Sequence, residues 1–109
     1  MFLSYKSKSL EKLCTDEKEM QKRRADIAKK LRLRINALEA FSTLAEVVAN
    51  DPLGKWHPLH GDRAGQWAGK VSSNERLIIQ PLANNEIRVE SILGSTFAEV
   101  QGIEDYHKG

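Results

Sequence analysis

Apolar residues recur at helical spacing through the first part of the chain. Between residues 17 and 41 they are separated by steps of seven, four, four, three and three, which keeps one stripe of a helix facing a core. We predict one long helix over about residues 17–41, with its basic residues, Arg34 included, on the solvated faces. The residues expected to face the core are Met20, Ile27, Leu31, Ile35, Leu38 and Phe41.

Helix-start residues indicate where the helices begin. Ser7 and Ser9 are both helix-start residues next to a short stretch in which Leu and Cys residues share one face, so a first helix is expected there. Asp16 with Glu19, and Thr43 with Glu46, have the spacing of capping boxes. The first pair would open the long helix, and the second would open a short helix that ends before the Pro and Gly at residues 52–54.

The pattern changes after residue 52 to short, partly alternating apolar runs separated by turn residues, which is typical of strands. We expect Pro81 to end the pairing of its strand. The candidate strands are QWAGKV (66–71), ERLIIQPL (75–82), IRVESIL (87–93) and EVQGIEDY (99–106), with a further short strand at residues 2–5.

The order of these elements is strand, helices, then a run of strands. Sequential strands joined by tight turns form an antiparallel meander. We therefore predict one α+β domain over residues 1–109, a small antiparallel sheet with the N-terminal helices packed on one face.

Charge is distributed unevenly along the chain. Residues 1–34 hold eleven Lys and Arg and five Asp and Glu (+6), whereas residues 35–109 hold six and ten (−4), which sums to the net charge of +2. The basic part could meet nucleic-acid phosphates or an acidic partner, or could be a solvated helix face.

Composition excludes several classes of protein. Cys14 is the single cysteine, so an internal disulfide or a cysteine-based zinc site cannot form. No apolar run approaches the ~20 residues that cross a bilayer, and the start of the chain lacks the pattern of a secretory signal. We expect a protein of the cytoplasm with no membrane partner.

All three histidines fall in two segments, HPLHGDR at 57–63 and DYH at 105–107. Histidines with an acid could bind a metal, but this spacing is not specific and Pro58 constrains the loop, so we expect no metal or other cofactor. Histidine titrates near neutrality, arginine binds phosphate, and tyrosine stacks on bases. Together these groups could cleave RNA without a metal, by acid–base catalysis at the ribose 2′-hydroxyl.

The loop HPLHGDRAGQW resembles the HPLKGDxxGxW-type loop of HigB toxins in the RelE/ParE superfamily. The segment NERLII is similar to that family's N-[WY]-R-[LI]-x-F strand, and IEDYHKG is similar to its IVDYH ending. The N-terminal YKSKSLEKLCTDEKEM also resembles a longer HigB-like branch, so the resemblance covers nearly the whole chain.

The resemblance implies a fold like that of microbial RNases and ribosome-dependent cleavage of messenger RNA, as the toxin of a type II toxin–antitoxin module. The partner would be a HigA-like helix-turn-helix antitoxin, and operator DNA would be bound only through that antitoxin.

The resemblance also suggests roles for individual residues. It implies catalytic roles for His57, Arg76, Asp105 and His107, to which we add His60 as a possible acid or base. Arg63, Lys70 and Tyr106 are expected to bind RNA.

The chain departs from the family pattern at three places. His60 stands where many relatives have a lysine, Glu75 stands where an aromatic residue is frequent, and segment 83–98 is longer than in compact toxins. These departures leave open an inactive module that binds an antitoxin or the ribosome without cleaving RNA. Inhibition of DNA gyrase, as by ParE, is a third alternative.

Overall fold

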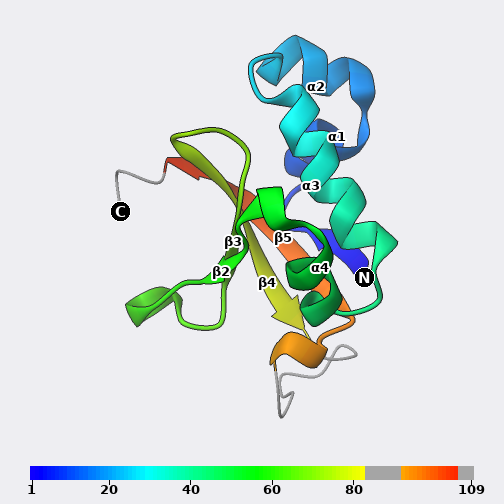
Figure 1. Cartoon of the computed structure of the whole chain (residues 1–109). Coiled ribbons are helices and arrows are strands. Elements are labelled where there is room, and N and C mark those ends of the chain that lie inside the picture. The colour runs from blue at the N-terminus through cyan, green and yellow to red at the C-terminus, as the bar shows by residue number, and fades with distance from the viewer. Residues whose placement is uncertain (83–91, 106–109) are drawn as a thin grey trace.

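The computed structural model describes residues 1–82 and 92–105, and shows a layer of helices against one face of a five-stranded sheet (Figure 1). The sheet has the order β1-β5-β4-β3-β2. The α+β architecture with helices on one face is confirmed. In chain order the elements are β1 Phe2–Tyr5, α1 Lys8–Thr15, α2 Glu17–Arg24, α3 Ala28–Ala40, α4 Leu44–Asn50, η1 Pro52–Gly54, β2 His57–Pro58, η2 Gly61–Arg63, β3 Trp67–Lys70, β4 Glu75–Leu82, η3 Ile92–Gly94 and β5 Phe97–Asp105.

The sheet is mixed, whereas the sequence predicted a wholly antiparallel one. β1 pairs in parallel with β5, from Phe2 opposite Phe97 to Tyr5 opposite Val100, and the other three pairings are antiparallel. A parallel pair needs a long crossover, and here the helical layer lies within the connection. The prediction assumed that strands pair with their neighbours in sequence, so it could not include pairing between such distant segments.

The predicted helix over residues 17–41 is two helices. α2 ends at Arg24, the Ile27 N–H donates to the Arg24 carbonyl at 3.1 Å in a tight turn, and α3 begins at Ala28. Arg24 also forms two hydrogen bonds to the Asp26 carboxylate, of 3.0 and 3.1 Å, which stabilise the turn. The apolar stripe survives the break, because Met20, Ile27 and the stripe residues of α3 are all buried.

The predicted helix starts are confirmed. Ser7, Asp16 and Thr43 are the N-caps of α1, α2 and α4, and each side chain accepts a hydrogen bond from a backbone N–H in the first turn. The sequence prediction placed Arg34 on a solvated helix face, and this is wrong, because only 2 % of Arg34 is exposed. Its Nη1 donates to Asp51 Oδ1 at 2.8 Å, so the buried charge has a partner.

The strands agree closely with the sequence prediction. β4 covers residues 75–82 as expected, but its pairing with β5 continues through Pro81 to Leu82, while its pairing with β3 stops at Ile79. Residues 92–94 form a short 3₁₀ helix rather than the end of a strand, and the rest of the predicted strand at 87–93 lies outside the described residues.

The core lies between the helices and the adjacent face of the sheet. Leu77 and Ile79 of β4 have no exposed surface, as do Leu31 and Leu38 of α3. The Trp56 indole covers β3 so closely that a Cβ on Gly69 would lie 2.6 Å from the ring. Cys14 is 3 % exposed, and burial raises the pKa of its thiol to about 11, which agrees with the prediction of a core residue rather than a nucleophile.

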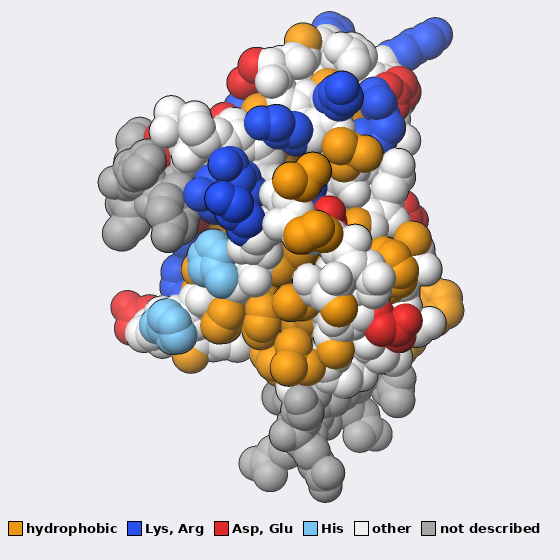
Figure 2. Space-filling view, viewed as in Figure 1, with side chains coloured by type: hydrophobic (Ala, Val, Ile, Leu, Met, Phe, Trp, Pro, Cys, Tyr) orange, Lys and Arg blue, Asp and Glu red, His pale blue; other side chains and the backbone are white. Residues whose placement is uncertain are grey.

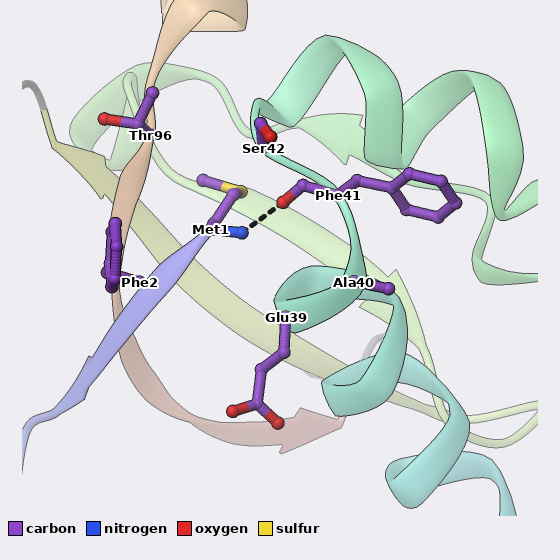
Figure 3. A pocket seen from close by; sticks show the side chains of 7 residues that line it. All are labelled: Met1, Phe2, Glu39, Ala40, Phe41, Ser42 and Thr96. Carbon is purple, nitrogen blue, oxygen red and sulfur yellow. Dashed lines mark hydrogen bonds between the residues drawn. The ribbon is translucent and has the colours of Figure 1, made fainter.

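The start of β1 is attached to the end of α3 (Figure 3). The Met1 amine donates to the Leu38 carbonyl at 2.7 Å and to the Phe41 carbonyl, so it satisfies two acceptors at the end of α3. The Phe2 ring stacks on Phe97 of β5 with a centroid distance of 5.1 Å. Across the described ranges, no helix has the length and apolar character needed to span a membrane.

Candidate active site

The face of the sheet opposite the helices carries the polar residues of the candidate site. Side chains alternate between the faces of a strand, so Leu77 and Ile79 point to the helices while Arg76 and Ile78 point away from them. The register places Arg76 directly opposite Glu104 of β5. The start of β4 and the end of β5 therefore bring opposite charges together on the open face.

A cleft of about 250 Å³ lies on this face, between the η2 loop and strands β3, β4 and β5. Ala68 and Ile78 are buried beneath it and give it an apolar floor. Its polar lining is His60, Arg63, Arg76, Glu104 and Asp105. The structure thus brings together four residues that the sequence predicted for the site, from the loop, β4 and the end of β5.

Arg63 and Glu104 form a bidentate ion pair in the cleft. The Arg63 Nη1 and Nη2 atoms donate to the two Glu104 oxygens at 2.5 and 2.6 Å, and Arg63 Nε donates to Gln66 at 3.0 Å. The hydrogen bonds from Arg63 hold the pKa of the Glu104 carboxyl below its usual range, and raise the pKa of Arg63. A carboxylate thus occupies the bidentate donor that a phosphate would use.

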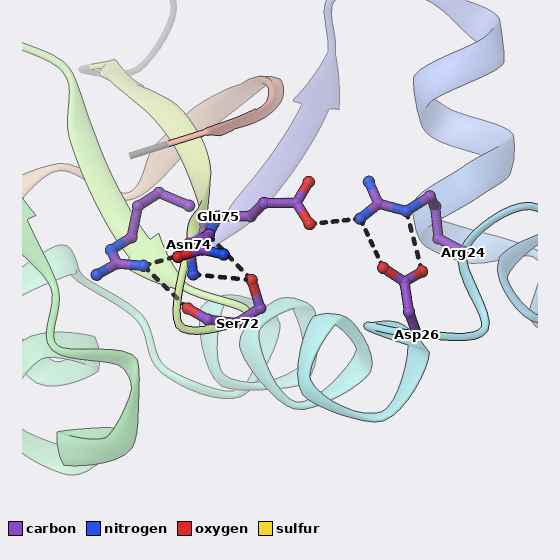
Figure 4. Close-up of polar contacts among 6 residues, drawn as sticks. Arg24, Asp26, Ser72, Asn74 and Glu75 are labelled. Atoms are coloured by element: carbon purple, nitrogen blue, oxygen red, sulfur yellow. Dashed lines mark hydrogen bonds and ion pairs between the residues drawn. The ribbon is translucent and has the colours of Figure 1, made fainter. Parts of the chain in front are cut away.

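Arg76 is oriented by the hairpin between β3 and β4. Its Nη1 donates to the backbone carbonyls of Ser72 and Glu75, each at 3.0 Å. The Ser72 hydroxyl in turn accepts from the Asn74 and Glu75 N–H groups at 3.2 and 2.9 Å (Figure 4). These contacts fix the guanidinium at the edge of the cleft before any ligand arrives.

Glu75 serves the other face of the sheet. Its carboxylate contacts Arg24 Nη2 at 2.5 Å, and Arg24 also pairs with Asp26 (Figure 4). Glu75 and Asp26 together raise the pKa of Arg24 through their hydrogen bonds. Glu75 therefore connects β4 to the end of α2.

His57 lies in β2, opposite Ala68, outside the residues that line the cleft. Its Nδ1 is 3.0 Å from the Lys55 carbonyl. A carbonyl only accepts hydrogen bonds, so Nδ1 is the donor in this contact. His60, by contrast, is exposed at the start of η2, where the loop enters the cleft.

Of the remaining predicted residues that the structure describes, only Asp105 lines the cleft. Lys70 ends β3 and lies opposite Arg76, but it borders a different hollow, between β3 and α3. Tyr106 and His107 lie outside the described residues. Asp105 is exposed at the end of β5 and reaches the cleft.

Glu104 is the site residue that sequence reasoning missed. Strand alternation offered a signal, because Glu104 of the IEDYH ending lies across from the strand arginine once the register of β4 with β5 is known.

Within residues 1–82 and 92–105, no three His, Cys, Asp or Glu side chains gather as metal ligands would.

Comparison with solved structures defines the class of fold. The chain is similar to a YoeB/ParE toxin from Agrobacterium tumefaciens, with a TM-score of 0.58 and 19 % identity over 96 % of this chain and 98 % of that one. It is also similar to YafQ from E. coli strain BL21(DE3), with a TM-score of 0.60 and 15 % identity over 97 % and 93 % of the two chains. No protein-family model and no curated protein matches the sequence. The chain therefore has the same fold as these two proteins.

Proposed function

We propose that this protein is the toxin of a type II toxin–antitoxin module and that it cleaves messenger RNA on the ribosome by metal-free acid–base catalysis. The observation that carries the proposal is the meeting of arginine, carboxylate and histidine groups in one cleft on the open face of a toxin-like sheet. The HigB-like motifs and the fold support the same reading. The partner would be a HigA-like antitoxin in the cytoplasm, and no cofactor is required.

In this mechanism a base removes the proton of a ribose 2′-hydroxyl, and the 2′-oxygen attacks the adjacent phosphorus. The bond from phosphorus to the 5′-oxygen then breaks, and an acid protonates the leaving oxygen. The products are a 2′,3′-cyclic phosphate and a 5′-hydroxyl. Nε2 of His57 would serve as the base, because Nδ1 is used in the contact with the Lys55 carbonyl.

Arg76 would hold the phosphate, since its guanidinium is already fixed at the edge of the cleft. His60 and His107 are the candidate acids, with Asp105 as the carboxylate that positions or assists them. Arg63, Lys70 and Tyr106 would bind the RNA backbone or a base. Arg63 can contribute only when a phosphate displaces Glu104 from its bidentate contact.

The test is expression of the chain without an antitoxin, with growth and transcript cleavage as readouts. We expect growth arrest and new 5′ ends by primer extension, both lost in Arg76→Ala and His107→Ala. Arg23→Ala is the matched control, because Arg23 lies on α2 and its side chain bonds to Ser9. If both site variants are folded and arrest growth as strongly as the parent chain, the assigned site is wrong.

A binding module that does not cleave RNA is the second candidate. It is favoured by the Glu104 carboxylate, which occupies Arg63, and by a histidine where relatives have lysine. The same experiment separates the two functions, since a binding module yields no new transcript ends.

A further inference from the structure

A second hollow, of about 490 Å³, lies between the first half of α3, the η1 turn and the end of β3. We call it the lysine groove, after the four lysines that border it: Lys29, Lys30, Lys55 and Lys70. Figure 2 shows lysine and arginine side chains gathered beside the histidines, with hydrophobic side chains next to them. The volume falls in the range of ~300–1,000 Å³ typical of ligand sites.

Two large apolar side chains also line the lysine groove. Leu33 is 45 % exposed and Leu53 is 72 % exposed. A single exposed leucine on a surface is ordinary, but two that border the same hollow form a small apolar contact area. A ligand that covered both side chains would remove their exposed apolar surface from water, which favours binding.

Every charged residue that lines the groove is a cation. Besides the lysines, Arg34 lines it, and its Nε has no hydrogen-bond partner in the described part of the chain. The charges of Lys55 and, less strongly, Arg76 and Lys30 lower the pKa of Lys70. The cations therefore repel one another, and an anionic ligand would relieve that repulsion.

We propose that the lysine groove binds an acidic, amphipathic peptide segment of a protein partner. Leucine-like side chains of the segment would cover Leu33 and Leu53, and its carboxylates would pair with the lysines around them. The identification of this partner with the antitoxin rests on the proposed function. The binding chemistry of the groove does not.

The lining favours a peptide over RNA. Proteins that hold single-stranded RNA use aromatic rings on which bases stack, and the groove lining contains none. Arg34, the one guanidinium, is buried and paired with Asp51, so it does not present its fork to phosphate. Aliphatic side chains surrounded by lysines instead match a segment with apolar residues on one face and acidic residues on the other.

The lysine groove lies close enough to the cleft that a peptide bound in the groove would affect RNA binding in the cleft. Lys70 borders the groove and lies opposite Arg76, which borders the cleft. A peptide in the groove would thus cover Lys70 and place negative charge beside the cleft. It would weaken RNA binding without entering the cleft itself.

The test uses the purified chain and a fluorescein-labelled peptide of about 14 residues, with Leu at positions i, i+3, i+4 and i+7 and Glu at the others. Fluorescence anisotropy is expected to show saturable binding that weakens with salt. Leu53→Ser and Lys30→Gln should each weaken it, by about tenfold and about threefold. Leu93→Ser and Lys22→Gln are matched controls, because both residues are exposed and outside the groove.

Two further probes define the outcomes. A peptide with Gln in place of Glu should bind more weakly, and a labelled oligouridine of about 12 nucleotides should bind Leu53→Ser as well as it binds the parent chain. Absence of peptide binding, or equal binding by all variants, overturns the proposal. The proposal is also overturned if Lys30→Gln weakens only oligouridine binding and Leu53→Ser changes the affinity for neither the peptide nor the oligouridine. The groove would then bind RNA and not a peptide. A chain that binds the peptide through the groove but cleaves no transcript contradicts the proposed function alone.

Discussion

The two faces of the sheet are built from neighbouring residues of the same strands, yet they do different work. On β4, Ile79 has no exposed surface beneath the helices, and Ile78 is 3 % exposed beneath the cleft. The glutamates differ in the same way, since Glu75 pairs with Arg24 on the helix face and Glu104 pairs with Arg63 on the open face. The covered face shows how the chain is stabilised, whereas the thinly covered face holds charged groups that a ligand can reach.

The largest expected difference between the faces is in packing. Ile79→Ala should lower the free energy of unfolding by about 3–4 kcal/mol, because helices surround the site and prevent it from collapsing. Ile78→Ala should cost roughly half as much, since only the loop side chains cover it. Urea unfolding followed by circular dichroism measures both, and equal losses would mean that the open face is packed as tightly as the core.

The next effect concerns the contact between β3 and Trp56 on the helix face. Gly69→Ala places a methyl group 2.6 Å from the indole ring, and overpacking of this kind costs about 1–3 kcal/mol. Gly94→Ala is the control, because a Cβ there meets no described atom within 4 Å. Thermal melts compare the two variants. A Gly69→Ala protein as stable as the parent would show that Trp56 moves at little cost.

Substitution of the two glutamates, each of which pairs with an arginine, distinguishes a role in ligand binding from a role in stability. Glu104→Gln removes the carboxylate that competes with phosphate for Arg63, so affinity for a short RNA should rise by about threefold or more. Glu75→Gln should leave RNA affinity unchanged and lower stability by about 1 kcal/mol or less. Anisotropy titrations at fixed salt measure the affinities. Equal effects of the two variants on RNA binding would contradict the division between the faces.

The smallest effect is a pH dependence of the Arg63–Glu104 pair. Arg63 lowers the folded-state pKa of Glu104, so the pair stabilises the fold above the ordinary pKa of glutamate, and this stabilisation is lost as the pH falls through the lowered value. Both side chains are substantially exposed, so we expect only a few tenths of a kcal/mol. Urea midpoints of the parent and Glu104→Gln should differ at neutral pH and converge in acid. A constant difference would exclude the ion pair as its cause.

Local patterns predicted most of the fold, because caps and apolar periodicity act over a few residues. Ser7, Asp16 and Thr43 start helices as expected, and β4 has the predicted bounds. The break before Ala28 escaped prediction, because the apolar stripe continues across it and only the turn at residues 25–27 interrupts the helix. The parallel pairing of β1 with β5 escaped it because no local pattern specifies a distant partner.

The site was predicted in composition more than in arrangement. His60, Arg63, Arg76 and Asp105 do line one cleft, and they come from the loop at 57–63, the strand at 75–82 and the segment at 105–107. Glu104 was missed, since its importance comes from cross-strand register and from the loop that folds over it. Arg34 was misplaced on a solvated face because its partner, Asp51, lies beyond the helix end, where helical periodicity no longer applies.

The pairing of β1 with β5 has a consequence for folding kinetics. Phe2 and Phe97 lie opposite each other although 95 residues separate them along the chain, and β5 also pairs with β4 to form the wall of the cleft. Contacts between such distant segments form slowly, after local helices and hairpins. During synthesis the helices and the β3–β4 hairpin can form first, whereas the cleft can form only after β5 has paired with β4. Newly made chains would therefore pass through a stage in which the cleft has not yet formed.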